Sequence, residues 1–298
     1  MPQIPPEVEG ALAEVGARCN VPVDDARLMH QHSNTAIALP AARLLVRVAS
    51  NPDALESIIS SVAVTRWLAS RDYPCVEPAE VGPFLVDGRV VSVWRLLDVA
   101  DKPAGAGAGL GRLLRALHRQ PTPPVPLRRL TDPFESVAAA VEQHPDGMTE
   151  ADRAWVRDQI GQLRRSWAVL DTALPTGLVH GDAHTNNLIR TTAGEVVLGD
   201  WDHVAHGPRE WDLIQPHYMA RRFGRHAEED LCRFTEAYGW DVRDWPGAGN
   251  LINIREITGL SPYIRKAPTD SWSRNEVAHR LSTLRYGDMS ARWNSPTR

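Results

Sequence analysis

The spacing of apolar residues changes near residue 100, and this change is the strongest constraint on the fold. Before it, short apolar segments separated by turn residues predict strands at 28–30, 35–39, 43–49, 83–86 and 89–96. Helical spacing in this part is confined to 6–19 and about 51–70. After it, helical spacing recurs at 110–119, 133–143, 149–169, 209–222, 226–238 and 272–287. The sequence therefore predicts an α+β chain with a small β-rich lobe followed by a larger helical lobe.

Residues 98–111, DVADKPAGAGAGLG, lie between the two patterns and are rich in Gly, Ala and Pro. Such composition is typical of a linker. We therefore expect an N-terminal lobe over residues 1–97 and a C-terminal lobe over residues 98–298.

Composition excludes several classes of protein. The net charge of -4 is not that of a nucleic-acid-binding domain, and no apolar run approaches the roughly 18 residues that a membrane span requires. The first residues, MPQIPPEVEG, carry acid and proline where a signal peptide would be basic and then apolar. Three scattered cysteines indicate neither a disulfide framework nor a metal site. We expect a cytoplasmic protein, as a monomer or a homodimer.

One stretch concentrates chemically active side chains. In LVHGDAHTNNLI, residues 178–189, apolar pairs flank a polar loop, and apolar segments at 188–190 and 196–198 predict a hairpin beside it. The hairpin would bring Asp200, which follows its second strand, close to Asp182 and Asn187. Their hard oxygen atoms suit Mg²⁺ together with substrate phosphates.

The motif His180-Gly181-Asp182…Asn187 followed by Gly199-Asp200-Trp201-Asp202 resembles the signature of aminoglycoside phosphotransferases and their choline-kinase relatives. The resemblance implies a bilobal protein-kinase-like fold and the mechanics of phosphoryl transfer that go with it. It implies that Asp182 orients or deprotonates the acceptor hydroxyl, and that His180 braces the catalytic loop. Asn187 and Asp200 would hold Mg²⁺.

Two further acids follow these motifs. Asp202 is interpreted either as a further metal ligand or as a structural cap. Asp212, in GPREWDL, is similar to a structural Asp-Leu segment of the same family, and we expect it to bind the loop backbone.

The resemblance also implies a nucleotide site in the first lobe, with departures from the family pattern. The family usually has a lysine on the third strand to contact phosphates, and here Arg47 occupies that strand. Ser33 and Asn34 stand where a glycine-rich phosphate loop is expected. The backbone at Arg95–Leu97 would meet the adenine edge.

The partner acid that the family carries on the following helix is not assigned by sequence. Glu56 lies near the start of the helix, and Ser61 occupies the position where the acid is expected.

These features predict an Mg²⁺-dependent O-phosphotransferase that uses ATP or GTP. The acceptor would be a hydroxyl group of a small molecule such as an aminoglycoside, an amino sugar or a nucleoside antibiotic, which connects the chain with antibiotic resistance. One alternative is a catalytically inactive kinase-like nucleotide-binding module. Another is a metal-dependent hydrolase in which His180 and His184 of the HxDxH pattern ligate zinc.

Overall fold

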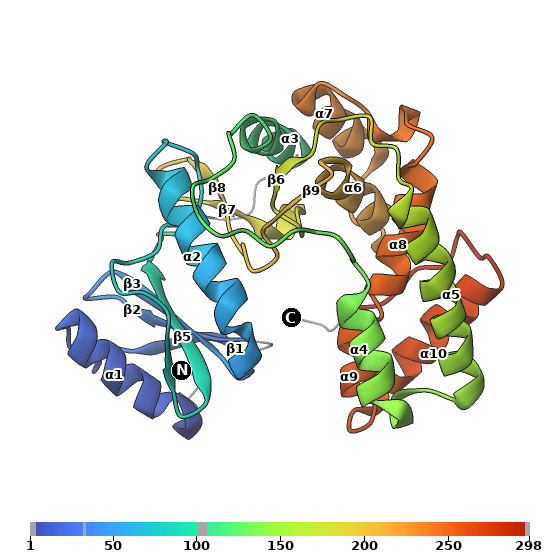
Figure 1. Cartoon of the computed structure of the whole chain (residues 1–298). Helices are drawn as coiled ribbons and strands as arrows, with labels where there is room; N and C mark the ends of the chain where they lie inside the picture. The colour runs from blue at the N-terminus through green and yellow to red at the C-terminus, as the bar shows by residue number, and fades with distance from the viewer. Residues whose placement is uncertain (1–3, 32–33, 101–105, 296–298) are drawn as a thin grey trace.

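The computed structural model describes residues 4–31, 34–100 and 106–295, which form two parts with the chain crossing once between them (Figure 1). The smaller part is built on a five-stranded antiparallel sheet with the strand order β1-β2-β3-β5-β4. Its strands are β1 (Arg27–Gln31), β2 (Asn34–Leu39), β3 (Leu44–Ala49), β4 (Phe84–Val86) and β5 (Arg89–Arg95).

A helix packs on each face of this sheet. Helix α1 (Glu9–Cys19), preceded by the short 3-10 helix η1 (Pro6–Val8), covers one face with Leu12 and Val15. Helix α2 (Leu55–Ala69), preceded by η2 (Pro52–Ala54), covers the other face with Ile58 and Val62. In Figure 1, α2 lies on the side of the sheet that faces the larger part.

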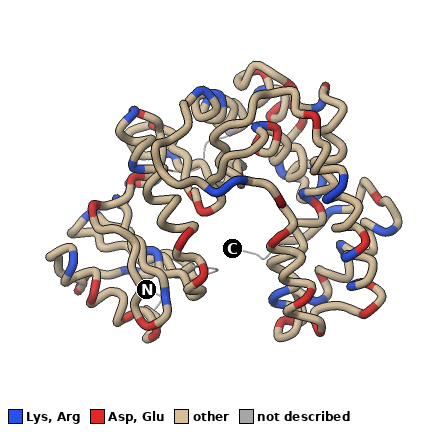
Figure 2. The backbone as a smooth tube through the Cα atoms, in the orientation of Figure 1, with Lys and Arg blue, Asp and Glu red and all other residues tan. Residues whose placement is uncertain are grey.

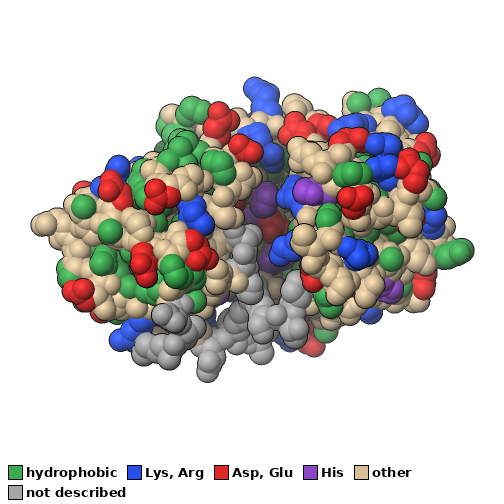
Figure 3. Space-filling view, turned by 90° about the horizontal axis from the view of Figure 1, so that it is seen from below, with side chains coloured by type: hydrophobic (Ala, Val, Ile, Leu, Met, Phe, Trp, Pro, Cys, Tyr) green, Lys and Arg blue, Asp and Glu red, His purple; other side chains and the backbone are tan. Residues whose placement is uncertain are grey.

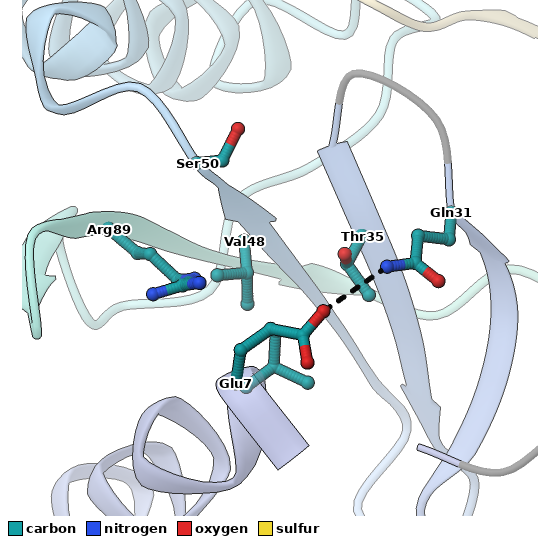
Figure 4. Close-up of a pocket in the computed structure, with 7 residues that line it drawn as sticks. Glu7, Gln31, Thr35, Val48, Ser50 and Arg89 are labelled. Carbon is teal, nitrogen blue, oxygen red and sulfur yellow. Dashed lines mark hydrogen bonds between the residues drawn. The ribbon is translucent and has the colours of Figure 1, made fainter. Parts of the chain in front are cut away.

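Strand alternation decides which side chains face the larger part. Val46 and Val48 pack under α1, so Arg47, which lies between them, points to the opposite face. A small recess that includes Val48 and Thr35 therefore opens on the α1 face, between Glu7, Gln31 and Arg89 (Figure 4). It is separated by the sheet from the face that carries Arg47.

The larger part is mainly helical. Its helices are α3 (Ala106–Leu117), α4 (Glu135–Gln143), α5 (Glu150–Ala168), α6 (Glu210–Phe223), α7 (Glu228–Tyr238), α8 (Ala248–Thr258), α9 (Ser261–Lys266) and α10 (Ser271–Arg285), with short 3-10 helices η3 (Pro145–Gly147), η4 (Thr185–Asn187) and η5 (Val242–Asp244). Two small antiparallel pairs, β6 (Gly177–Val179) with β9 (Ala205–Gly207) and β7 (Leu188–Arg190) with β8 (Val196–Leu198), lie next to the smaller part.

The predicted hairpin 188–190/196–198 is confirmed as β7–β8. Sequence analysis did not predict the β6–β9 pair or the helices α8 and α9. Helix α8 has no apolar stripe to reveal it, because Arg255 and Glu256 are buried together with Leu251, Ile254 and Ile257.

The linker prediction over 98–111 is wrong for its second half, since α3 already begins at Ala106. The glycines there serve close packing: a Cβ atom on Gly107 would overlap the backbone of Asp230, and one on Gly111 would overlap that of Phe234, both on α7. Residues 101–105 lie outside the described part. Among the described residues, no helix is long and apolar enough to cross a membrane.

Candidate active site

A buried carboxylate, that of Asp212, holds the backbone of the loop that follows β6. Asp212, on α6, accepts hydrogen bonds from the backbone N–H groups of His180 (2.7 Å) and Gly181 (2.8 Å), and its Oδ2 lies 3.1 Å from Nε2 of His118. Burial by itself would raise the pKa of Asp212, but His118, His180 and these hydrogen bonds together hold it below the ordinary value. The expectation that Asp212 binds the loop backbone is confirmed.

Gly181 is required by the shape of this loop. Its φ is +88°, and a Cβ atom at this position would overlap the carbonyl group of His203. Its own carbonyl oxygen accepts hydrogen bonds from Trp211 Nε1 (3.1 Å) and Arg255 Nη2 (3.1 Å). The guanidinium of Arg255 also stacks 3.6 Å over the Trp211 ring, so the loop is held from both sides.

His180 is a structural member of the loop. It is fully buried, its Nε2 lies 2.9 Å from the carbonyl oxygen of Gly199, and its Nδ1 accepts the N–H of Asp182 at 3.3 Å. A neutral ring with the proton on Nε2 satisfies both contacts, and burial lowers the pKa of His180 in agreement with that form. The brace role implied by the family resemblance is the role that these contacts describe.

The same contacts argue against the zinc hydrolase. Both ring nitrogens of His180 are already engaged, so this residue cannot ligate zinc beside His184. Within the described ranges, no three His, Cys, Asp or Glu side chains converge as a metal site of that kind requires.

Asp182 presents its carboxylate at the open side of the loop. Oδ1 accepts a hydrogen bond from Gln215 Nε2 at 2.8 Å, and Oδ2 lies 3.4 Å from Nε2 of His184. Burial by itself would raise the pKa of Asp182, but His184, His203 and Arg255 together hold it well below the ordinary value. Asp182 is therefore an ionised carboxylate with a fixed orientation.

Asn187 and Asp200, the two predicted metal ligands, are linked through the backbone, since the N–H of Gly199 donates to the carbonyl oxygen of Asn187 at 2.8 Å. Asn187 donates from Nδ2 to the carbonyl oxygen of Asp182 (2.9 Å), which leaves its Oδ1 as an acceptor. Asp200 has a φ of +61°, and its carboxylate is 49% exposed. Trp201 is fully buried beside His180, so the acids on either side of it, Asp200 and Asp202, point away from the core.

Arg47 joins the small lobe to these acids. Its guanidinium lies 2.8 Å from Asp202 and 3.4 Å from Asp200, although 155 and 153 residues separate them in sequence. Burial opposes the charge on Arg47, but the two carboxylates more than offset this and raise its pKa. Figure 3 shows that the molecule is hollowed between its two parts and that His and Asp or Glu side chains line the hollow.

Other predicted nucleotide residues lie at the same face or outside the described part. Ser33 is among the residues not described. Asn34 begins β2 opposite Ala49 and therefore lies on the same face of the sheet as Arg47. Ser61 is buried on α2, whereas Glu56 is exposed and forms no ion pair with any described residue.

The segment after β5 pairs with the end of β7, the strand that follows the loop with Asp182 and Asn187. The N–H of Arg95 donates to the Glu77 carbonyl at 2.8 Å, whereas no described residue hydrogen-bonds the backbone of Leu97. Asp98 and Ala100 then pair with the end of β7, since Thr192 N donates to Asp98 O and Ala100 N donates to Arg190 O, both at 2.8 Å. The predicted adenine edge thus lies beside the exit of the loop that carries Asn187.

Three residues of this site were missed by sequence reasoning. Gln215 contacts the Asp182 carboxylate, Arg255 contacts the Gly181 carbonyl, and His118 contacts Asp212. No spacing or motif could have indicated them, because they come from α6, α8 and the turn after α3, which meet only in the folded chain.

Acidic and basic residues are interspersed along the backbone of both parts of the molecule (Figure 2).

Comparison with known proteins identifies relatives of this arrangement. A sequence model described as "Phosphotransferase enzyme family" matches residues 28–248. No curated protein sequence matches the chain.

Several solved structures are similar over most of the chain. A choline/ethanolamine kinase family protein from Mesorhizobium loti is 16% identical, with a TM-score of 0.63 over 92% of this chain and 93% of that one. The GDP and kanamycin complex of APH(2'')-IIIa is 13% identical, with a TM-score of 0.64 over 93% and 99%. The aminoglycoside phosphotransferase APH(3'')-Id of Streptomyces rimosus, in complex with ADP and streptomycin, is 17% identical, with a TM-score of 0.59 over 83% and 98%. The bilobal kinase-like fold that the motifs imply is confirmed.

Proposed function

Because this chain belongs to the phosphotransferase enzyme family and is a small-molecule kinase, we propose that it transfers the γ-phosphoryl group of ATP or GTP to a hydroxyl group. The acceptor would be a small molecule of the aminoglycoside, amino sugar or nucleoside antibiotic class. The similar structures support nucleotide use, since they include complexes with ADP and with GDP. Those same proteins bind streptomycin and kanamycin.

In the proposed reaction, the acceptor oxygen forms a bond to the γ-phosphorus as the bond to the bridging β–γ oxygen breaks. Asp182 accepts the proton of the acceptor hydroxyl on its carboxylate, which Gln215 and His184 hold in orientation. Arg47 binds phosphate oxygens, and the backbone at Leu97 binds the adenine edge. His180 and Asp212 keep the loop in place.

The donor set fits a magnesium ion. Asn187 and Asp200 would hold it, since Asp200 has an exposed carboxylate, Asn187 offers an amide oxygen, and Mg²⁺ commonly takes one or two carboxylates together with phosphates. When bound, the ion would neutralise the charge that develops on the phosphates.

One observation carries the proposal. A cation from the β-rich lobe and the acids from the helical lobe meet at one place, with Arg47 2.8 Å from Asp202 and 3.4 Å from Asp200. Asp182 and Asn187 are joined directly to each other beside them. A proton acceptor, metal ligands and a phosphate-binding cation are the parts that phosphoryl transfer needs.

The test begins with nucleotide binding. Thermal denaturation of the wild-type chain is measured with ATP, GTP and ADP, each with and without Mg²⁺, and we expect stabilisation that requires a nucleotide. A panel of hydroxylated acceptors is then screened for transfer of labelled γ-phosphate, with Asp182→Asn as the inactive control. Binding without transfer to any acceptor and without slow ATP hydrolysis would favour the inactive module. No binding of any nucleotide would contradict the proposal.

A further inference from the structure

We propose that Asp202 is the positioning residue of Arg47: it holds the guanidinium in the orientation in which Arg47 meets the nucleotide phosphates. This inference rests on the proposed function, because it assumes that Arg47 binds phosphate. It assigns Asp202 a part distinct from metal binding and from a structural cap.

The geometry of the pair supports this assignment. Nη1 of Arg47 donates to Oδ1 of Asp202 at 3.2 Å and Nη2 donates to Oδ2 at 2.8 Å, so two parallel hydrogen bonds join the two planar groups. Asp200 receives a single, longer contact of 3.4 Å from the same Nη2. Two bonds fix both the position and the plane of a guanidinium, whereas one long contact fixes neither.

Burial distinguishes the two acids in the same way. The side chains of Arg47 and Asp202 are 21% and 23% exposed, whereas that of Asp200 is 49% exposed. The Asp202 pair is therefore partly withdrawn from water, where its hydrogen bonds are stronger. Asp200 keeps the more open carboxylate, which suits a ligand that arrives from solution.

Helix α2 offers no carboxylate for this task. Glu56 is exposed and forms no ion pair with a described residue, and the buried Ser61 is uncharged. The acid that orients Arg47 thus comes from the other lobe, two residues after Asp200. A lysine at position 47 could not make two parallel bonds to Asp202, which gives a reason for arginine on this strand.

The sign of the change in nucleotide affinity distinguishes the two roles that Asp202 could have. A carboxylate close to phosphates repels them, so removing its charge should tighten nucleotide binding when no metal is present. If Asp202 instead orients Arg47, its removal should weaken that binding, because Arg47 must then be ordered when the nucleotide binds. The two roles predict opposite changes.

The experiment measures the dissociation constant of ADP by calorimetry in buffer containing EDTA. We expect Asp202→Asn to weaken ADP binding about tenfold, which is about 1.4 kcal/mol. In the Arg47→Ala background the same change should have no further weakening effect, since there is no guanidinium left to orient. Asp200→Asn should leave ADP binding in EDTA equal or tighter.

Control variants separate an effect on the orientation of Arg47 from a loss of folding. Glu142→Gln, which breaks the exposed ion pair with Arg157, should change nothing, and thermal denaturation checks that each variant folds. If Asp202→Asn does not fold, Asp202→Ser removes the same charge. Equal or tighter ADP binding by the Asp202 variant, or equal weakening with and without Arg47, would overturn the inference and leave the function intact.

Two results for the wild-type chain complete the test. Binding of ADP only when Mg²⁺ is present would show that Arg47 does not hold phosphates by itself, which overturns the inference alone. No binding under either condition would overturn the phosphotransferase proposal and the role of Asp202 with it.

Discussion

The loop that carries Asp182 and the strand residue Arg47 both belong to the candidate site, but the fold holds them by different means. The loop is fixed within the helical lobe by hydrogen bonds to fully buried Asp212 and by Arg255, which is 8% exposed. Arg47 is held across the two lobes by carboxylates that remain partly exposed. The loop is therefore part of the core of the helical lobe, whereas the position of Arg47 depends on how the two lobes meet.

This difference matters for binding. Breaking a buried hydrogen bond leaves an unsatisfied polar group, so the loop keeps its shape whether or not a ligand is present. A partly exposed ion pair contributes little to the free energy of unfolding, even where it orients its two groups. We therefore expect changes in the loop to lower the stability of the protein, and changes at Arg47 to act mainly on nucleotide binding.

The largest effect should come from Asp182, the loop residue to which we assign the proton transfer. Asp182→Asn removes the proton acceptor but keeps the size of the side chain, so kcat should fall at least about a hundredfold. Unfolding and the dissociation constant of ADP should be nearly unchanged. Wild-type turnover in this variant would remove Asp182 from the role of base.

A second variant tests how rigidly the loop is built. Gly181→Ala should lower the free energy of unfolding by about 3 kcal/mol, because it combines a left-handed backbone with overlap of the His203 carbonyl. Gly194→Ala is the matched control: its φ is +89°, but a Cβ atom there meets nothing within 4 Å. Urea denaturation measures the free energy of unfolding of both variants. Equal losses of stability would show that the loop can move to accommodate the added Cβ atom.

Asp212, the buried carboxylate that binds the loop backbone, should make the free energy of unfolding depend on pH in the acid range. The pKa of Asp212 is lowered by folding, so its stabilisation is complete above its ordinary pKa of about 4 and is lost as pH falls through the lowered value. Asp212→Asn should cost about 3 kcal/mol at neutral pH and lose this acid dependence. Denaturation from pH 7 to pH 2 measures this dependence, with Asp146→Asn, a change of an exposed acid, as control. If Asp212→Asn lowers the free energy of unfolding by the same amount at every pH, Asp212 is not the source of the acid dependence.

Substitutions of Arg47 test the nucleotide side of the candidate site. Each charge-assisted contact with a phosphate is worth about 1.5–3 kcal/mol, so Arg47→Ala should lower kcat/KM for ATP ten- to a hundredfold. Arg47→Lys should lose less, mainly through a higher KM for nucleotide. Thermal stability should hardly change, in contrast to the loop variants. Steady-state kinetics decides the matter, since unchanged kcat/KM in Arg47→Ala would exclude Arg47 from the site.

The smallest effect should come from the contact that orients the base. Gln215→Leu removes the 2.8 Å hydrogen bond to Asp182, and we expect kcat to fall about tenfold with little change in the KM for ATP. Gln162→Leu removes a similar but exposed amide–carboxylate contact with Asp158 and should have no effect. Gln215→Asn shows whether a shorter amide restores part of the rate. A raised KM with normal kcat would assign Gln215 to substrate binding instead.

The sequence by itself determined the elements that have a clear period and the motif that has a fixed spacing. Strands β2, β3 and β5 and helices α2 and α5 were predicted because apolar residues recur along them at the spacing of a strand or a helix. Asp182, Asn187 and Asp200 were predicted together because the β7–β8 hairpin, which is local, brings them together. These properties depend on residues close to one another in the chain.

Only the tertiary structure decided which distant groups complete the site. The contacts of Arg47 with Asp202, of Gln215 with Asp182 and of Arg255 with Gly181 join residues 155, 33 and 74 positions apart. No local preference encodes such contacts, because they depend on the packing of whole helices and on the approach of the two lobes. The same reason explains the glycines of α3: their sequence indicates a linker, but in the folded chain they allow the backbone of α7 to pack closely against this helix.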